Sequence, residues 1–253
     1  MVHLGGESAT AGPEPAERLC LQPHPSPRIR MITVHHLEHS RSHRVLWLLE
    51  ELGLAYELRR YARDPDTLLA PADLKAVHPL GKSPVVTDGD LTVAESAAIL
   101  EYLLDAHGEG RLRPSPGTPA YLRYRYWLHY AEGSAMPPLL LRLVFDRVAQ
   151  APMPFFVRPI AKAIATKANK AFIGPQLDLH LDYMEAELAK TRWFAGDEFS
   201  AADIQMSYPI EAAAARAGLN ESRPRLMDYL ARIQTRPAYQ RATERGGPPI
   251  PGQ

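Results

Sequence analysis

The stretch TVHHLEHSRSHRVLWLLEELGL, residues 33–54, passes from a strand pattern to a helix pattern within a few residues. Its first letters belong to RMITVHHL, a run with β-branched residues that is typical of a buried strand. Beyond the polar letters, apolar residues recur at helical spacing and a glycine follows: Val45, Leu48, Leu49, Leu52 and Gly53. The stretch therefore predicts a strand over 30–37 and a helix over 42–53.

Strand and helix patterns keep alternating up to about residue 107. AYELRRYA is predicted as a strand, and DTLLAPADLKAVHP as a short helical stretch interrupted by proline. In SPVVTDGDLTVAE, Asp88-Gly89 between two apolar runs predicts a hairpin, and ESAAILEYLLDAHG predicts an amphipathic helix. The order β-α-β-α-β-β-α makes the first two strands parallel and the last two antiparallel. A thioredoxin-like fold, a four-stranded mixed sheet with helices on both faces, satisfies this order.

The second half of the chain carries helical patterns only. A Gly/Pro-rich linker over 108–119 ends in Thr118 as helix N-cap, with Pro119 at the first helical position. Further helical patterns cover 139–148, 155–190, 201–217 and 225–236. Pro175 is expected to kink or break its helix. Ser200 and Asp203 form an S-x-x-D capping box, whose expected role is structural.

These patterns divide the chain into five parts. The proline-rich first thirty residues are predicted to be a disordered extension without a secretory signal pattern. The expected parts are the extension 1–30, the thioredoxin-like domain 31–107, the linker 108–119, the all-helical domain 120–246 and a tail 247–253.

Composition excludes several function classes. The 253 residues have a formal net charge of zero, which gives no electrostatic case for nucleic acid or an anionic membrane as partner. No apolar run approaches the roughly 20 residues that span a bilayer. The single cysteine, Cys20, excludes an internal disulfide framework, and this fits a reducing, cytoplasmic location. Because Cys20 lies in the extension, thiol-disulfide exchange by a protein cysteine is not expected.

The histidine-rich loop raises the possibility of a metal site, but the spacing of the histidines argues against such a site. His39 and His43 are four residues apart, yet the helix is only beginning there. His35 and His36 are adjacent in a strand, so their side chains point to opposite faces. A zinc site needs three or four converging ligands. We therefore expect no metal site.

Three other features together describe a peptide-like ligand. Ser40 and Ser42 lie at a helix N-terminus, where backbone N–H groups attract anions; either serine can instead simply cap the helix. In HPLGKSPVV, the Ser83-Pro84 bond between a turn and a strand favours a cis peptide, which would present the Ser83 backbone to an extended peptide. Glu95 and Ser96 open the next helix, so that Ser96 can hold a carboxylate and Glu95 an amino group.

These motifs, in this order and spacing, resemble those of the cytosolic glutathione transferases over about 31–245. The resemblance rests on HSRSHRVLWLLEELGL, HPLGKSP, the ES helix opening, the Pro-rich linker and FSAADI. WLHYAEGSAMPPLL further resembles a bacterial and fungal subgroup related to the theta and other serine-type classes. The resemblance implies a glutathione transferase that stabilises the glutathione thiolate for attack on small, mostly apolar electrophiles.

The resemblance also assigns roles to individual residues. Lys82 and the Ser83 backbone would hold the glycine end and cysteinyl amide of glutathione, beside the cis-proline Pro84. Glu95 and Ser96 would anchor the γ-glutamyl group.

Ser40, four residues before Arg44, matches the catalytic hydroxyl of theta-like enzymes. The loop has no tyrosine, however, and Ser42, His39, Arg41 or a backbone N–H stay open as alternatives for the sulfur contact.

The resemblance further implies glutathione as co-substrate without a prosthetic group, a homodimer, and a detoxification role. Four side chains are possible liners of the second-substrate site, although core packing is an equally simple role for them: Trp127, Tyr130, Met136 and Phe145. The rival functions are a glutathione-dependent peroxidase or dehalogenase on the same scaffold, and a non-catalytic glutathione-binding module.

Overall fold

The structure is a computed structural model that describes residues 31–65, 67 and 69–250. The expected disordered extension 1–30, with Cys20 in it, lies outside the described residues. So do residues 251–253 of the expected tail.

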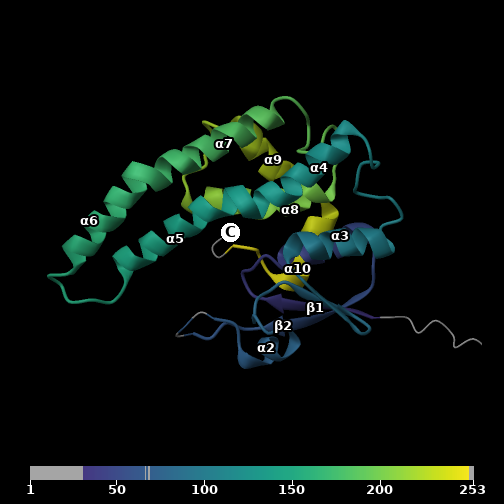
Figure 1. Ribbon diagram of the computed structural model, residues 1–253, viewed down its shortest axis with the longest axis horizontal. Helices are drawn as coiled ribbons and strands as arrows, with labels where there is room; N and C mark the ends of the chain where they lie inside the picture. Colours follow the sequence, from purple (N-terminus) through teal and green to yellow (C-terminus); the bar gives the residue numbers. More distant parts are fainter. Residues whose placement is uncertain (1–30, 66, 68, 251–253) are drawn as a thin grey trace, which may run out of the picture. The chain divides into compact units, whose positions relative to one another are not determined.

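The first half of the described chain contains a four-stranded sheet in the order β2-β1-β3-β4. Figure 1 labels β1 and β2 of this sheet. Its strands are β1 (Ile32–Leu37), β2 (Tyr56–Tyr61), β3 (Val85–Asp88) and β4 (Leu91–Ala94). β1 pairs in parallel with β2 and antiparallel with β3, and β3 pairs antiparallel with β4. The predicted thioredoxin-like topology, including the hairpin, is confirmed.

Helices pack on both faces of this sheet. They are α1 (His43–Leu52), α2 (Ala72–Val77) and α3 (Ser96–His107). Val34 and Val86 of the sheet belong to the main core with α1 and α3, whereas Leu37 and Tyr61 pack with Leu74 of α2 in a smaller cluster. α1 ends at Gly53 in the left-handed conformation (φ 68°), as its sequence predicted.

Beyond the linker, all the secondary-structure elements of the described residues are helices. The elements are α4 (Pro119–Tyr130), α5 (Met136–Gln150), α6 (Arg158–Ala168), α7 (Gly174–Leu188), α8 (Ala201–Arg216), α9 (Pro224–Gln234) and α10 (Pro237–Gly246). Thr118 caps α4 by accepting the N–H of Tyr121 at 3.1 Å. The capping box of α8 is present, since Ser200 N–H donates to Asp203 Oδ2 at 2.9 Å.

Two π-helical segments, which the sequence analysis did not foresee, join these helices. They are η1 (Ala131–Ala135), between α4 and α5, and η2 (Asn169–Ile173), between α6 and α7. In each, the N–H of the first residue after the segment bonds to a carbonyl five residues back. Pro137 and Pro175 follow directly, and a proline has no N–H and clashes with the carbonyl four residues before it. The expectation of a kink or break at Pro175 is therefore replaced by a change of helical register through the wider π turn.

The last helix returns to the first one. In α10, Arg241 Nε bonds to Glu50 Oε2 of α1 at 2.8 Å, and Arg236, just before α10, bonds to Glu51 Oε1 at 2.6 Å. After α10, the side chain of Ile250 is buried in the main core. Over the described residues, no helix combines the length and the apolar character needed to cross a membrane.

Candidate active site

Five of the residues predicted for ligand binding lie together in one cleft. The cleft has a volume of about 220 Å³ and is lined by Arg41, His78, Leu80, Lys82, Ser83, Pro84, Ala94, Glu95, Ser96 and Glu132. They come from the β1–α1 loop, the turn before β3, the junction of β4 with α3, and η1. We call this cavity the cis-proline cleft, because the Ser83-Pro84 peptide bond is cis.

Ser83 fixes the turn of the cleft to the sheet. Its Oγ donates to the carbonyl of His35 at 3.0 Å and accepts the N–H of Leu37 at 3.2 Å. Both partners belong to β1, so the residue before the cis-proline is held by the strand that leads into the serine loop. Lys82, next to it, has an exposed side chain and brings a positive charge to the cleft rim.

Glu95 and Ser96 stand at the start of α3 in a constrained geometry. Glu95 has φ 72° and ψ 123°, a conformation that costs a non-glycine residue of order 1–3 kcal/mol. Its carbonyl accepts the N–H of Ile99 at 2.9 Å, while its side chain remains exposed at the cleft. The Ser96 hydroxyl is buried and accepts Nη2 of Arg44 at 2.9 Å.

Ser40 lies at the inner end of the same region. Its Oγ is 3.5 Å from Ser83 Oγ and 2.7 Å from Ser42 Oγ, and only 6% of the residue is exposed. Ser42 occupies the N-cap position of α1, but its hydroxyl makes no cap hydrogen bond. The hydroxyl instead contacts Nδ1 of His36 at 2.8 Å. The idea that Ser42 simply caps the helix through its side chain is therefore wrong.

The other candidates for the sulfur contact take different positions. Arg41 lines the cleft, where its Nε lies 3.0 Å from both carboxylate oxygens of Glu132. His39 has a positive φ of 50°, is exposed, and has Nδ1 at 3.3 Å from the carbonyl of Pro248. Over the described residues, no group of three or more potential metal ligands lies together.

A charged cluster that sequence analysis missed connects the cleft to the helical half. The fully buried guanidinium of Arg44 donates to Glu132 Oε1 at 2.6 Å and to the carbonyl of Gln205 at 2.8 Å, in addition to Ser96. Burial would raise the pKa of Glu132, but the guanidinium groups of Arg44 and Arg41 hold it below its usual value. The S-x-x-x-R spacing marked Arg44, whereas nothing in the sequence marked Glu132, because its place depends on η1.

The suggested liners of a second-substrate site contribute to packing. Trp127, Tyr130 and Met136 belong to the main core and Phe145 is partly buried against it, and none of them lines the cis-proline cleft. The Tyr130 hydroxyl is 2.6 Å from Nδ1 of His180.

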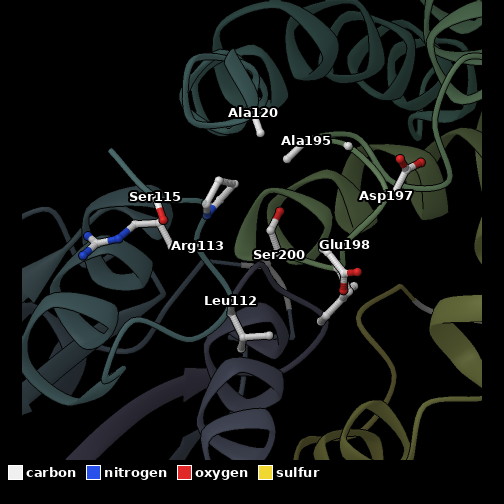
Figure 2. A pocket seen from close by; sticks show the side chains of 11 residues that line it. Leu112, Arg113, Ser115, Ala120, Ala195, Asp197, Glu198 and Ser200 are labelled. Atoms are coloured by element: carbon white, nitrogen blue, oxygen red, sulfur yellow. The ribbon is translucent and has the colours of Figure 1, made fainter. Parts of the chain in front are cut away.

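A second cavity, of about 390 Å³, lies between the linker and the loop before α8. Figure 2 shows Arg113 and Ser115 on one side of it and Asp197 and Glu198 on the other. It is larger than the cis-proline cleft but contains none of the predicted ligand-binding residues.

Comparisons with known proteins identify the family of the chain. Residues 30–105 match the family "Glutathione S-transferase, N-terminal domain", and residues 170–232 match "Glutathione S-transferase, C-terminal domain". Glutathione S-transferase 3 of Schizosaccharomyces pombe is 38% identical, over 85% of this chain and 88% of that protein. The chain belongs to the glutathione S-transferase family.

Solved structures of the family show the same fold. A glutathione S-transferase from Actinobacillus pleuropneumoniae is 36% identical with a TM-score of 0.69, covering 85% of this chain and 93% of that one. A sphingomonad glutathione S-transferase complexed with glutathione is 25% identical with a TM-score of 0.65, covering 85% of this chain and 98% of that one.

Proposed function

We propose that this chain is a glutathione transferase that binds glutathione in the cis-proline cleft and stabilises its thiolate for attack on small, mostly apolar electrophiles. Family membership supports the reaction type. The observation that carries the location is the convergence of Lys82, Ser83, Pro84, Glu95 and Ser96 on one cleft. Two separate segments of the chain supply these residues, and Ser40 lies just behind Ser83.

The charges at the cleft are complementary to those of glutathione, which has two carboxylates and one amino group. Lys82 would pair with the glycine carboxylate, and the Ser83 backbone would hold the cysteinyl amide. Glu95 would take the γ-glutamyl amino group, and Ser96, at the start of α3, would bind the adjacent carboxylate. Arg44 supports this by holding the Ser96 hydroxyl.

We further propose that the chain is of the serine type, related to the theta class, with Ser40 as the hydroxyl that contacts sulfur. Lowering a thiol pKa by about two units needs about 2.7 kcal/mol of thiolate stabilisation. A hydrogen bond to a charged partner contributes about 1.5–3 kcal/mol, and a helix N-terminus about 0.3–1 kcal/mol. One hydroxyl at the start of α1 is therefore sufficient. Ser42, His39, Arg41 and a backbone N–H remain the alternatives.

A homodimer, a cytoplasmic location and a detoxification role complete the proposal. Exposed apolar side chains on α4 and α7 support a dimer, because a monomer rarely leaves such side chains uncovered together: Leu122, Tyr126, Leu179 and Tyr183. Sedimentation of the wild type tests this directly, and a monomer at micromolar concentration would refute it.

Retention on immobilised glutathione tests the binding site. The wild type should be retained, and Ser96→Ala should bind roughly tenfold more weakly because it loses a hydrogen bond to a charged group. Ser115→Ala, a matched change in the second cavity, should bind like the wild type. Failure of the wild type to bind would refute the proposal.

Turnover separates the rival functions. Conjugation of an aryl halide supports the transferase, whereas reduction of an organic hydroperoxide alone supports a peroxidase. Binding without either reaction supports a non-catalytic module.

The sulfur contact is tested by the pKa of bound glutathione, read from thiolate absorbance. Ser40→Ala should raise that pKa, and an unchanged value would move the role to one of the alternatives.

A further inference from the structure

A continuous row of hydrogen bonds leads from Ser40 away from the cleft to the end of α10. Ser40 Oγ is 2.7 Å from Ser42 Oγ, and Ser42 Oγ is 2.8 Å from His36 Nδ1. On the other side of the ring, His36 Nε2 is 2.8 Å from the carbonyl oxygen of Gly246. All three side chains are buried, so water does not compete for these contacts.

The direction of each hydrogen bond follows from the last one. A carbonyl oxygen only accepts, so Nε2 of His36 must carry hydrogen and, in the neutral ring, Nδ1 must accept. Ser42 therefore donates to Nδ1, and Ser40 donates to Ser42. The competing acceptors are farther away, since the Leu37 carbonyl is 3.4 Å from Ser42 Oγ and Ser83 Oγ is 3.5 Å from Ser40 Oγ. Ser40 Oγ also accepts the backbone N–H of Ser42 at 3.3 Å, which leaves one lone pair of Ser40 to accept a proton.

We infer that His36 is the terminal proton acceptor for the glutathione thiol, reached through Ser40 and Ser42. This inference rests on the proposed function, in which Ser40 contacts the sulfur. The thiol proton passes to Ser40 Oγ while the Ser40 proton passes to Ser42 Oγ and the Ser42 proton to His36 Nδ1. One S–H and two O–H bonds break, and two O–H bonds and one N–H bond form. Sulfur keeps its electron pair as thiolate, and His36 becomes an imidazolium ion.

The shift reverses the hydrogen bonds between Ser40, Ser42 and His36. His36 then donates to Ser42, Ser42 to Ser40, and Ser40 to the thiolate. The same transfer that removes the thiol proton thus supplies the hydroxyl hydrogen that stabilises the product. The Gly246 carbonyl keeps its hydrogen bond from Nε2 throughout, and this bond favours the imidazolium form.

The surroundings of His36 keep it neutral until a thiol arrives. Burial lowers its pKa, and the nearby positive charge of Arg60 adds to the effect. The groups facing it are Glu38 and His39 of the loop, Arg60 of β2, and His43 of α1. Burial also lowers the pKa of His43, to about 3, so His43 adds no charge near neutral pH. The negative sulfur at the far end of the row is the charge that offsets the new imidazolium ion.

The inference makes a prediction about protons that hydroxyl stabilisation alone does not. If Ser40 only donates to the sulfur, the thiol proton goes to the buffer and one proton appears per thiolate formed. With the relay, His36 retains the proton. Both quantities are measurable near neutral pH, the thiolate by its ultraviolet absorbance and the released protons by an indicator dye. S-Methylglutathione, which has no thiol, serves as the blank for all other protonation changes.

The wild type should release well under one proton per thiolate formed. His36→Asn should release one proton per thiolate and form about tenfold less thiolate, because the amide oxygen accepts from Ser42 but does not take up a proton at this pH. Ser42→Ala, which interrupts the row in the middle, should also release one proton per thiolate. His35→Gln is the control, since His35 points to the other face and bonds to Tyr61 and Thr87.

Release of one proton per thiolate by the wild type would overturn the relay and leave binding and activation at Ser40 standing. This measurement needs no variant, so a misfolded mutant does not obscure it. A wild-type release equal to that of His35→Gln but below that of His36→Asn supports the relay. Failure of the wild type to bind immobilised glutathione is a separate result, which refutes the proposed function itself.

Discussion

Replacing Glu132 with glutamine should destabilise the protein more than its half-exposed position suggests. Glu132 is the carboxylate partner of Arg44, whose guanidinium is fully buried and lies 2.6 Å from Glu132 Oε1. Removing one partner of a buried ion pair costs about 3–5 kcal/mol, because the other charge stays buried without compensation. The Glu132 side chain is 32% exposed, so water partly screens the pair and we expect about 2–3 kcal/mol.

Urea unfolding followed by tryptophan fluorescence measures this change. The thermal midpoint should fall by roughly 4–12 °C, since 1 kcal/mol corresponds to about 2–4 °C for a protein of this size. Arg41→Gln is the matched control. It removes the other guanidinium that contacts Glu132, but the Arg41 side chain is 35% exposed and its ion pair should contribute at most about 1 kcal/mol.

The pH dependence gives an independent check. Arg44 and Arg41 hold the pKa of Glu132 below its usual value against the effect of burial. A carboxyl group with a lowered folded-state pKa contributes stability that is present above its unfolded pKa, 4.5 for a glutamate, and is lost as the pH falls through the folded pKa. Glu132→Gln should reduce this loss in acid. Ordinary surface substitutions change the free energy of unfolding by at most about 0.5 kcal/mol. If Glu132→Gln lowered it by no more than this, the reasoning would be refuted.

Three further changes test other parts of the fold. Burial raises the pKa of Glu211 to about 7, above its unfolded value of 4.5. Between these two pH values the folded state binds more protons than the unfolded state, so the contribution of Glu211 to stability falls as the pH rises. Between pH 5 and pH 8, the free energy of unfolding of Glu211→Gln should rise by about 2–3 kcal/mol relative to that of the wild type, as measured by urea titration. A difference that stays constant with pH would contradict this. Glu185 accepts two backbone N–H groups at the start of α9, both at 2.9 Å, so Glu185→Ala should lower the free energy of unfolding by about 1–2 kcal/mol, while the exposed Glu198→Ala should not. Gly246→Ala places a Cβ in a clash with Cδ1 of the buried Leu46 and 3.1 Å from His36 Cε1, and should cost about 1–3 kcal/mol; an unchanged thermal midpoint would show that α10 moves aside freely.

Much of the thioredoxin-like half is predictable because its signals are local. Asp88-Gly89 marks the hairpin and Gly53 ends α1; each of these depends on the conformational preference of one or two residues. In the helical half, Thr118 marks the start of α4 in the same way. The ligand-binding residues were also found from short motifs, since Ser83-Pro84 and Glu95-Ser96 lie at the ends of predicted elements. Their roles stay a prediction.

The rest depends on register and long-range contacts, which short motifs do not encode. The π turn of η1 brings Glu132 to Arg44, yet a helical pattern followed by prolines does not reveal by how much the turn widens. The left-handed conformation of Glu95 has no side-chain signature. The hydroxyl of Ser42 was expected at the helix N-terminus, but its partner is His36, whose other nitrogen is held by a residue 210 positions away.

That distant contact has a consequence for the order of synthesis. A ribosome makes β1, the serine loop and the cis-proline turn early, and such an N-terminal half folds before the helical half is finished. The carbonyl of Gly246, which fixes the ring of His36, is made 210 residues after His36. A nascent chain in which all the cleft residues are already made therefore still lacks the group that anchors the row behind Ser40. The same dependence applies to any truncation or fusion close to the C-terminus, which acts on the first loop of the fold although it lies at the opposite end of the sequence.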